Sequence, residues 1–425
     1  MTALVIAHGH PRFNKGGAEI AAYRLYQALR ETEGWEQSCF LAACPDNAIL
    51  KPGCEVFGIS DSEWMIRRSS DPFLHDTNIN ITTTAHGFLY SILKDLNPNV
   101  IHVHHYVHIG LDLLHALMRW FPKAKILLTL HEYWGLCPYE GRLLKRSGRF
   151  CNGPEPDDCA TCVGEEMRLP LAVRRLRVEH FFAMIDQFIS PSYFLKQRYV
   201  DWGIPDDRIT VIENLPLRDH DVNSLSLPSI DMEMKEKEAL VFAYFGQINR
   251  WKGIDIILEA FCLAVQQCPN LCLELHGLSR DIFFGEQDFY DQDFLLRCRR
   301  LFNRLPSSSI RLMGAYEPGE LKSRLQVVDV VVMASRWYEN SPMVIQEAFS
   351  NGVPVIAPNY GGMAEKIKHR TTGLLFNPLC EDDLSNSFLL MAQHPDLLLD
   401  MKRNSKENSL AYDEVLQSHI ALYGE

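Results

Sequence analysis

The sequence predicts an α/β protein built on two parallel sheets, and three observations support this prediction. Short apolar runs alternate with amphipathic helical stretches along the whole chain, which is typical of parallel strands joined by helical crossovers. A polar segment with two prolines, residues 215–238, interrupts the alternation and has the composition of a linker. The chain on each side of this segment is long enough to bury a core of its own.

The runs that we expect to form strands follow one another in a regular order. The helix expected after the first run covers Ala18–Arg30, and the last expected helix covers Leu410–Leu422. In the first half of the chain the expected strands are Leu4–Ala7, Ser38–Ala43, Glu55–Ile59, Val100–His105, Lys125–His131, Gln187–Ser190 and Thr210–Ile212. In the second half they are Leu240–Gly246, Cys272–Gly277, Ile310–Gly314, Asp329–Ala334, Val353–Ala357 and Gly373–Phe376.

The composition excludes several classes of protein. The chain has 425 residues, of which 47% are hydrophobic and 23% charged, so it is not a largely disordered chain. Its net charge of −12 argues against a general nucleic-acid binder. The longest apolar run, Ala239–Phe245, is far too short for a membrane helix. The first residues lack the basic part of a signal peptide, and the 12 cysteines are too dilute for a disulfide scaffold, so we expect a reduced, cytoplasmic setting.

The most informative stretch, residues 333–357, combines a strand end, an acidic loop and a helix start. The loop carries Glu339, proline suits the first helical turn at Pro342, and Ser341 is expected to cap the helix. The amides of the first turn would form a seat for an anion such as a diphosphate, and Glu347 lies further along the same helix. Two carboxylates beside an anion seat suggest that they bind hydroxyls, and hence a ligand with phosphate and sugar. A surface loop with two solvated glutamates is the alternative.

Three further stretches follow expected strands. After the strand that ends at Gly246, Lys252 lies beside a helix start, where a cation can neutralise phosphate, although the P-loop pattern is absent. Gly16 and Gly17 follow the first strand and open a helix, so the backbone there can approach a ligand closely. His131 lies at the end of a buried strand. Taken singly, each of these features also fits a solvated loop or a structural histidine.

Together, the four stretches resemble the retaining glycosyltransferases of family 4, the glycogen-synthase-like group with the GT-B fold. The pair Glu339 and Glu347 is similar to the family's E-x7-E signature, and AFSNGVPVIAPNYGGMAEKI with TTGLLFNP resembles the segment that follows it. GQINRWKG resembles the family's phosphate loop, and KGGAE resembles its N-terminal glycine loop. The resemblance spans nearly the whole chain and is strongest over residues 239–380. It implies two Rossmann-like domains that face a central cleft.

The resemblance also implies a division of the chain. Residues 1–214 would form the acceptor-side domain, with a cysteine-containing insert, preceded by HEYW, at about residues 137–165. Residues 215–238 would be the linker, and residues 239–409 would bind the nucleotide sugar. Residues 410–425 would form a helix that crosses back to the first domain.

Individual residues take roles from the same resemblance. The expected catalytic residues are Glu339 at the donor sugar, Lys252 at the departing diphosphate, and His131 near the reacting carbon. The expected donor-binding residues are Gly16, Gly17, Gln247, Arg250, Asn340, Ser341, Pro342, Met343, Val344 and Glu347, of which Glu347 would hold the ribose. The loop Ala315–Tyr316 would lie beside the base, and His105 and Tyr133 would lie on the acceptor side. The family has arginine where this chain has Gln247, so either Arg250 supplies the second cation or the leaving group is held less tightly.

The implied reaction is transfer of a hexose-like unit, with retention, from a UDP- or GDP-linked sugar to a hydroxyl of a glycan or of a lipid-linked acceptor. Preorganised cations and amides would stabilise the departing diphosphate, and catalysis would require no cofactor or divalent metal. Two other interpretations stay open. Gln247 is compatible with a catalytically weak protein that binds sugar nucleotides or serves as a scaffold. An epimerase or phosphorylase of the same fold is the third possibility.

Two segments carry separate hypotheses. Four thiols in the insert could hold zinc or an iron–sulfur cluster, with free thiols or a disulfide as the alternatives; they are Cys137, Cys151, Cys159 and Cys162. Residues 142–177 hold eight Lys or Arg against five Asp or Glu, and apolar residues lie between Arg168, Arg174, Arg175 and Arg177. This segment could contact an anionic membrane at its inner face or a lipid-diphosphate acceptor, or could be a solvated helix face. His102 and His104 are expected to be core residues.

Overall fold

The computed structural model describes residues 1–44, 56–67, 88–218, 239–277, 283, 291–380 and 382–424. The chain divides into two compact units, Met1–Leu215 with Asp413–Glu425, and Pro216–Tyr412. Most of the expected linker, residues 219–238, lies outside the described residues. Among the described residues, no helix is long and apolar enough to cross a membrane.

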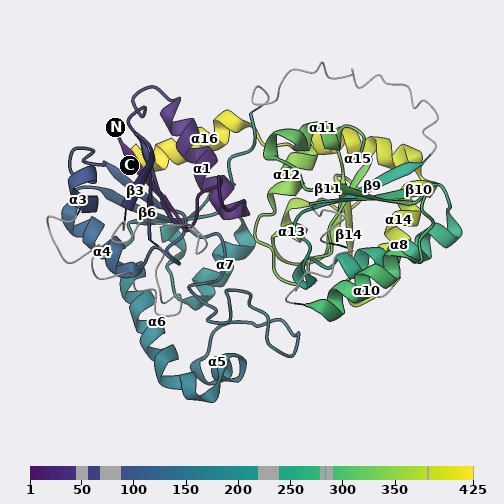
Figure 1. The fold of residues 1–425 in the computed structure, drawn as a ribbon, viewed down its shortest axis with the longest axis horizontal. Coiled ribbons are helices and arrows are strands. Elements are labelled where there is room, and N and C mark those ends of the chain that lie inside the picture. Colours follow the sequence, from purple (N-terminus) through teal and green to yellow (C-terminus); the bar gives the residue numbers. More distant parts are fainter. Residues whose placement is uncertain are drawn as a thin grey trace. The chain divides into compact units, whose positions relative to one another are not determined.

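Figure 1 shows the first unit with β3 and β6 labelled in its sheet. Within the described residues this sheet has eight strands, in the order β3-β4-β2-β1-β5-β6-β7-β8. Every pair of neighbouring strands is parallel except β3 and β4. The strands are β1 Ala3–Ala7, β2 Cys39–Ala43, β3 Val56–Ser60, β4 Glu63–Ile66, β5 Val100–Val103, β6 Lys125–Thr129, β7 Gln187–Ser190 and β8 Ile209–Val211. The helices are α1 Gly17–Arg30, α3 Phe88–Leu93, α4 Leu111–Trp120, α5 Pro156–Val163, α6 Arg168–Ala183, α7 Tyr193–Trp202 and α16 Tyr412–Gly424, with 3-10 turns at Glu165–Met167 and Asp206–Arg208.

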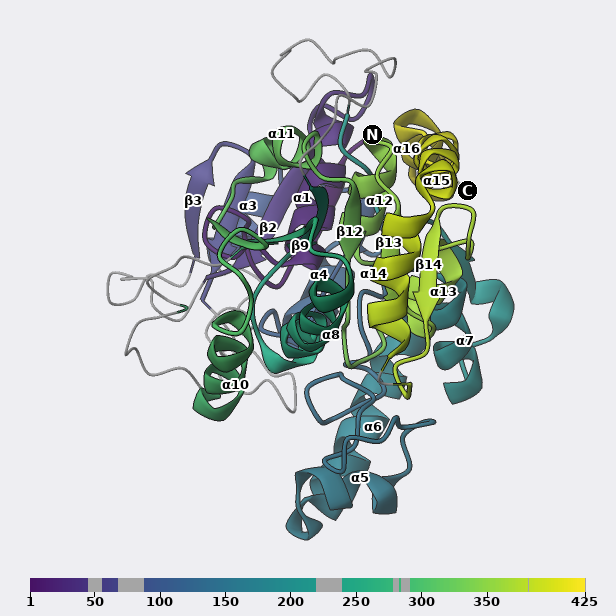
Figure 2. The same ribbon diagram turned by 90° about the vertical axis from the view of Figure 1, so that its right-hand side faces the viewer.

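In the described part of the second unit, the sheet has six strands in the order β11-β10-β9-β12-β13-β14, and all neighbouring strands are parallel. Figure 2 shows β9, β12, β13 and β14 of this sheet. Separate apolar cores cover its two faces, one built with α8 and α14 and the other with α11 and α12. The strands are β9 Leu240–Phe245, β10 Leu271–His276, β11 Ile310–Gly314, β12 Val330–Val332, β13 Val355–Pro358 and β14 Gly373–Phe376. The helices are α8 Ile254–Gln267, α10 Gln292–Phe302, α11 Leu321–Leu325, α12 Met343–Ser350, α13 Gly361–Lys366, α14 Asp383–Gln393 and α15 Pro395–Glu407, with 3-10 turns at Arg250–Lys252 and Pro318–Glu320.

The prediction of two parallel α/β sheets is confirmed, with one local difference. The apolar pattern of the sequence does not predict β4, and it predicts β3 as one more parallel strand. In the structure, β3 and β4 are antiparallel and only two residues separate them. A connection this short can join antiparallel strands only, because a parallel pair needs a crossover of a dozen residues or more.

Each sheet changes direction at one place, and this is where a ligand is expected. In the first unit β1 has β2 on one side and β5 on the other, and in the second unit β9 lies between β10 and β12. The crossovers on the two sides of such a point run in opposite directions, which leaves a crevice at the carboxyl ends of the strands. A ligand site is therefore expected at the loops that follow β1, β5, β9 and β12.

The last helix, α16, belongs to the first unit and is fixed to its sheet by a buried histidine. The Tyr423 hydroxyl lies 2.6 Å from Nδ1 of His102, whose Nε2 lies 2.7 Å from the Thr129 hydroxyl. His102 is fully buried on β5, so both ring nitrogens are satisfied by side chains from neighbouring elements. The Lys125 ammonium adds a hydrogen bond to the Leu422 carbonyl at 2.7 Å.

We predict that Tyr423→Phe destabilises the first unit. The substitution keeps the ring and leaves one nitrogen of His102 unsatisfied in the core, which costs about 1–3 kcal/mol of unfolding free energy. Urea unfolding followed by tryptophan fluorescence measures this change. Tyr193→Phe, at a position that is 69% exposed, is the control and should stay within about 0.5 kcal/mol of the parent. Equal stabilities of the two variants would contradict the assignment.

Candidate active site

The loop after β12 presents a buried carboxylate, Glu339, which three side chains contact through a single oxygen. Oε1 accepts hydrogen bonds from the Lys252 ammonium at 2.5 Å, the Ser335 hydroxyl at 2.7 Å and the Trp337 indole N–H at 3.1 Å. The Glu339 residue is 6% exposed, so this charge is held away from bulk water by an opposite charge and two neutral donors. The structure thus brings together Glu339 and Lys252, which lie 87 residues apart in the sequence.

Local backbone geometry fixes Lys252 in the loop after β9. The Asn249 side chain accepts hydrogen bonds from the amides of Trp251 and Lys252, at 3.0 and 3.1 Å, and so caps the short 3-10 turn. Gly253 follows with φ 67°, and a Cβ there would lie 1.9 Å from the Ala334 carbonyl oxygen. Only glycine lets these two loops approach so closely, and this approach places Lys252 within reach of Glu339.

A second ion pair holds the same two loops together. The Arg336 guanidinium donates to both carboxylate oxygens of Asp255, each at 2.7 Å, and the Arg336 amide donates to the Trp251 carbonyl at 2.7 Å. Asp255 is 3% exposed and lies in the first turn of α8. A bidentate pair of this kind fixes both distance and orientation. Asp255 and Arg336 are therefore positioning residues for Lys252 and Glu339, and no pattern in the sequence singles them out.

Two glycines of α13 complete the support of the acidic loop. A Cβ on Gly362 would lie 1.6 Å from the Asn340 carbonyl oxygen, and the Gly362 amide donates to the Glu339 carbonyl at 2.7 Å. Gly361 has φ 64° and lies close to the same carbonyl. The backbone of residues 339 and 340 thus packs directly against Gly361 and Gly362, which follow β13.

The helix start differs from the sequence prediction in one respect. The cap position of α12 is Pro342, with no side-chain hydrogen bond, so the predicted capping role of Ser341 is wrong. Proline at this position has no amide to satisfy and has an extended ψ of 114°, so the helix begins one residue later, at Met343. The first-turn amides of Met343 and Val344 still follow directly on the acidic loop, where the helix dipole favours an anion.

Glu347 lies one turn into α12 and near the loop after β11. Burial raises the pKa of Tyr316, in the loop after β11, to about 12, and the charge of Glu347 acts in the same direction. The Tyr316 ring also contacts Phe245 edge-on, with centroids 5.7 Å apart, and the Arg324 guanidinium lies over it at 5.4 Å. Arg324 in turn donates to the carbonyls of Met313 and Ala315, each at 3.0 Å, and so fixes the loop that carries Tyr316.

Gln247 and Arg250 lie on the exposed side of the β9 loop. The Tyr244 hydroxyl donates to the Gln247 backbone carbonyl at 2.6 Å, and Gln247 itself is exposed. Arg250 forms an ion pair with Asp291 at 2.8 Å, and its side chain is 55% exposed. The guanidinium that the sequence suggested as a second phosphate cation is therefore bound to a carboxylate in this structure.

The first unit has a cavity of about 400 Å³ at the carboxyl ends of its strands. The loops after β1 and β5, on the two sides of the place where the sheet changes direction, line this cavity, as do residues at the ends of β2 and β6. The lining residues are His8, Gly9, His10, Phe13, Asn14, Ala43, Cys44, His105, Val107, His108, Glu132 and Trp134. A cavity with a polar wall of histidines and a carboxylate at this place fits a ligand that offers several hydrogen-bonding groups.

The glycine loop lies against a buried carboxylate of α1. Glu19 is 2% exposed. Its Oε1 lies 3.1 Å from Nε2 of His8 and accepts a hydrogen bond from the side-chain nitrogen Nδ2 of Asn14 at 2.5 Å. A Cβ on Gly16 would come within 2.3 Å of Glu19 Oε2. Because Gly16 has no Cβ, the Glu19 carboxylate has room to contact His8 and Asn14 in the loop after β1. Gly17 is the first residue of α1.

His131 belongs to a row of histidines behind this cavity. Its Nε2 lies 2.9 Å from Nδ1 of His104, and the two rings stack 5.2 Å apart. Burial and the neighbouring His105 lower the pKa of His131 to about 3, so the ring is neutral at pH 7. A neutral imidazole can donate or accept a hydrogen bond but cannot act as a cation.

His105 and Glu132 form a contact pair at the wall of the cavity. The Val107 amide donates to Nδ1 of His105 at 3.0 Å, which places the ring proton on Nε2 and directs it to Glu132. Burial raises the pKa of Glu132 and lowers that of His105 well below its usual value. Such a pair can hold a hydroxyl and share its proton.

The structure changes the set of acceptor-side residues. Tyr133 is fully buried, so its side chain offers no surface to an acceptor, and the prediction for this residue is wrong. Its neighbours Glu132 and Trp134 line the cavity instead. The sequence indicates that residues here lie near a ligand site, because His131, Glu132 and Trp134 all follow the end of a buried strand. It does not show which of these side chains point toward the cavity.

The four cysteines of the insert are free thiols in the structure. Cys159 and Cys162 lie one turn apart on α5, and burial with the neighbouring thiols Cys137, Cys151 and Cys162 raises the pKa of Cys159 to about 11. Within the described part of the chain, no three His, Cys, Asp or Glu side chains are arranged to hold a metal ion.

Two family models match this chain. Residues 15–215 match the family model Glycosyltransferase Family 4, and residues 230–408 match Glycosyl transferases group 1. A Campylobacter jejuni relative, N,N'-diacetylbacillosaminyl-diphospho-undecaprenol alpha-1,3-N-acetylgalactosaminyltransferase, is 27% identical over 78% of this chain and 87% of its own. Against three other curated relatives the chain covers 61%, 48% and 36% of their lengths, which is about half on average.

Solved structures share the fold over the full length. Sucrose-phosphate synthase from Thermosynechococcus elongatus has a TM-score of 0.69 at 18% identity and covers 100% of this chain and 98% of its own. Anabaena HepE, in complex with UDP and glucose, has a TM-score of 0.63 at 16% identity and covers 100% of both chains. The chain therefore belongs to the family 4 glycosyltransferases and has the GT-B fold.

We predict that Gly362→Ala destabilises the second unit by about 1–3 kcal/mol, because the new methyl group must displace the backbone of the acidic loop. Thermal and urea unfolding measure the change. Gly319→Ala is the matched control, since a Cβ there meets no atom within 4 Å, and it should change stability by less than about 1 kcal/mol. A fully stable Gly362→Ala variant would show that residues 339 and 340 do not rest on this glycine.

We also predict that the first unit loses stability in mild acid. Burial lowers the pKa of His102, His104, His105 and His419. The unfolded chain protonates these side chains near pH 6.5 and the folded unit does not, so the unfolded state binds more protons as the pH falls. Each such histidine then contributes up to about 1.4 kcal/mol of lost stability per pH unit below 6.5.

Urea midpoints at pH 7.5, 6.0 and 5.0 test this prediction. His419→Leu removes one buried histidine and should reduce the slope, whereas His394→Leu, at an exposed position, should leave it unchanged. Midpoints that do not move between pH 7.5 and 5.0 would rule out the buried, neutral histidines as the cause.

Proposed function

We propose that this chain transfers a hexose-like sugar, with retention, from a nucleoside diphosphate sugar to a hydroxyl of a glycan or lipid-linked acceptor. The observation that carries the proposal is the ion pair between Lys252 and Glu339, which lies where the second sheet changes direction between β9 and β12. The pair offers an ammonium for a diphosphate and a carboxylate for sugar hydroxyls in one place.

The donor would lie along the carboxyl edge of the second sheet. Glu347 would hold the ribose, and the amides of Met343 and Val344 would bind phosphate at the start of α12. Tyr316 would lie beside the base, because its ring packs against Phe245 at the end of β9. We favour uridine as the base, since HepE has been solved with UDP-glucose.

Charge development explains how such a site would accelerate the reaction. As the bond between sugar and diphosphate breaks, negative charge grows on the leaving group and positive character grows on the sugar. Lys252 and the helix amides would stabilise the leaving group, and such preorganised donors act more strongly in a site shielded from water. Retention follows if the acceptor attacks from the side of the leaving group, in which case no protein nucleophile is required.

The acceptor would occupy the cavity of the first unit. His105 and Glu132 would orient its hydroxyl, and neutral His131 would form a hydrogen bond with the donor sugar near the reacting carbon. The name of the Campylobacter jejuni relative specifies a diphospho-undecaprenol acceptor, which supports a lipid-linked acceptor for this chain.

A second candidate, a protein that binds sugar nucleotides with little turnover, is favoured by one observation. Gln247 replaces the expected arginine, and Arg250 is bound to Asp291. The two candidates differ in whether nucleoside diphosphate is released when an acceptor is added.

Release of UDP or GDP from UDP- and GDP-sugars, with and without a lipid-linked acceptor, tests the proposal. We predict that Lys252→Ala lowers kcat about 100-fold to 1,000-fold, which is the range for loss of one preorganised donor at a developing charge. UDP-sugars should be turned over in preference to GDP-sugars.

Lys322→Ala, which removes a lysine from α11 in the same unit, is the control and should retain full activity. Circular dichroism establishes that both variants are folded. Near-normal turnover by Lys252→Ala would reject the role of this lysine, and sugar-nucleotide binding without acceptor-dependent release would favour the second candidate.

A further inference from the structure

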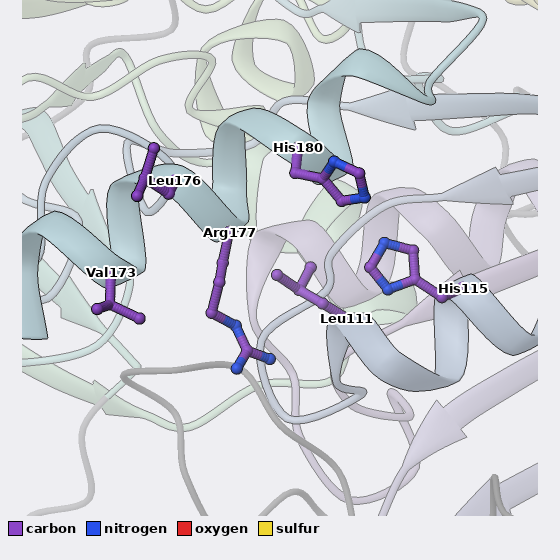
Figure 3. Close-up of a pocket in the computed structure, with 6 residues that line it drawn as sticks. All are labelled: Leu111, His115, Val173, Leu176, Arg177 and His180. Atoms are coloured by element: carbon purple, nitrogen blue, oxygen red, sulfur yellow. The ribbon is translucent and has the colours of Figure 1, made fainter.

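An apolar cavity of about 320 Å³ lies between α4 and α6 of the first unit (Figure 3). Its lining residues are Leu111, His115, Val173, Leu176, Arg177 and His180. Figure 3 shows the rings of His115 and His180 facing each other at one end of this cavity. The wall has almost no polar surface, so it offers few of the directed hydrogen bonds that distinguish one ligand from another. Such bonds are available in the second unit, at the loop that follows β11.

The Arg324 guanidinium, on α11, holds the loop after β11 by its carbonyl oxygens. It donates to the carbonyls of Met313 and Ala315, each at 3.0 Å, and to that of Gly314 at 3.4 Å. Gly314 has φ 74°, a left-handed conformation that glycine adopts without steric cost. The chain turns at this glycine, so three successive carbonyls reach one cation.

The amides of the same loop therefore point away from Arg324. In a planar trans peptide the N–H lies opposite the carbonyl of the preceding residue, and the described chain has no cis peptide bond. The carbonyls of Gly314 and Ala315 thus direct the Ala315 and Tyr316 amides to the side away from Arg324. Within the described residues, neither amide donates a hydrogen bond. Two successive amides that point the same way attract an oxygen atom that carries partial negative charge.

Buried hydrogen bonds fix the position of Arg324 itself. Nη1 of Arg324 lies 3.2 Å from Nδ1 of His276, whose Nε2 lies 3.1 Å from Oε2 of Glu274. A guanidinium can only donate, so Nδ1 of His276 accepts this bond and the ring proton on Nε2 is directed to Glu274. His276 and Glu274 are both buried at the end of β10. We call these three side chains the Glu274–His276–Arg324 network.

The buried end of this network is held firmly. The Arg311 guanidinium donates to Oε1 of Glu274 at 3.2 Å. Burial acts to raise the pKa of Glu274, but hydrogen bonds from His276 and Arg311, together with the Arg311 charge, outweigh it and hold the pKa below its ordinary value. Glu274 is therefore ionised at neutral pH and is a strong acceptor for His276. The His276 ring also stacks on Phe245, with centroids 4.2 Å apart.

We propose that the Glu274–His276–Arg324 network makes the donor site selective for a nucleobase that presents a keto oxygen, as uracil does, over one that presents an amino group, as cytosine does. The amides of Ala315 and Tyr316 donate to the keto oxygen. An amino group in the same place brings hydrogen atoms toward two donors and leaves both of them without an acceptor. The inference rests on the proposed function, because it specifies which nucleotide the second unit binds beside Tyr316.

Calorimetric titration of UDP and CDP into the full-length protein tests the proposal. The two nucleotides share ribose and diphosphate, so a difference in their affinities reports on the base alone. We expect UDP to bind about tenfold or more tightly than CDP, which is the effect of leaving a shielded donor unsatisfied. Equal dissociation constants for UDP and CDP would overturn the proposal.

Arg324→Gln releases the loop and should bring the dissociation constants of UDP and CDP to within about threefold of each other. Inorganic pyrophosphate, which has no base, should bind this variant and the parent equally. Lys322→Gln, which removes a cation from the same helix, is the matched control and should keep the preference of the parent. Circular dichroism establishes that both variants are folded.

Arg324→Lys retains a cation but reaches fewer carbonyls than a guanidinium, so its preference for UDP should lie between those of Arg324→Gln and the parent. A merely structural role would weaken the binding of UDP, CDP and pyrophosphate together and would leave the ratio of UDP to CDP affinity unchanged. That result, or the full preference for UDP in folded Arg324→Gln, would reject the assignment to Arg324.

The same titrations separate this inference from the proposed function. A parent protein that binds UDP and CDP equally and still transfers sugar loses the base selectivity alone. A parent that prefers UDP to CDP, but releases no UDP from a UDP-sugar when an acceptor is added, keeps the base selectivity and loses the transfer function. A parent that binds neither nucleotide rejects both.

Discussion

The bond between Lys252 and Glu339 organises the second unit, because it joins the loops that follow two neighbouring strands at the point where the sheet reverses its order. A buried carboxylate is costly unless it is paired and hydrogen-bonded, and here an ammonium, a hydroxyl and an indole share one oxygen of Glu339. The surrounding features serve this arrangement. Gly253 and Gly362 permit backbone contact that a Cβ would prevent, and the pair of Asp255 with Arg336 fixes the spacing of the loops.

Much of this architecture could be predicted from sequence because buried parallel strands have a simple signature. Continuous apolar runs located the strands of both sheets, and the resemblance in the E-x7-E segment identified the family. The pattern failed for β4, where Glu63 and Trp64 interrupt the apolar run and a two-residue turn reverses the chain. It also could not show that Arg250 binds Asp291 or that Tyr133 is buried, because composition does not fix the direction of a side chain at a loop. The roles assigned to the individual site residues, and a cleft between the domains, stay predictions.

Burial makes the first unit rich in neutral histidines. His102 is expected to be structural and is so, with both nitrogens bonded to hydroxyls. His104, His105 and His131 are as strongly desolvated, yet they lie at the strand ends, where His105 borders a cavity. Desolvation removes their charge and leaves their directional hydrogen bonds, which suits groups that must orient a neutral sugar. Histidine thus has two roles in this unit. His102, within β5, holds α16 against the sheet, and His105, just after β5, lines the candidate site.

The return of α16 to the first unit has a consequence for biosynthesis. Because Asp413–Glu425 belong to the first unit, the second unit is a continuous insertion between Leu215 and Asp413. During translation the second unit has all its residues before the first unit has its last helix, so the domain that begins earlier is finished later. Until α16 has been synthesised, the surface around His102 and Trp35 that Tyr423 contacts is exposed to solvent. A nascent chain at that stage would present an exposed apolar surface, which is the kind of surface that chaperones bind.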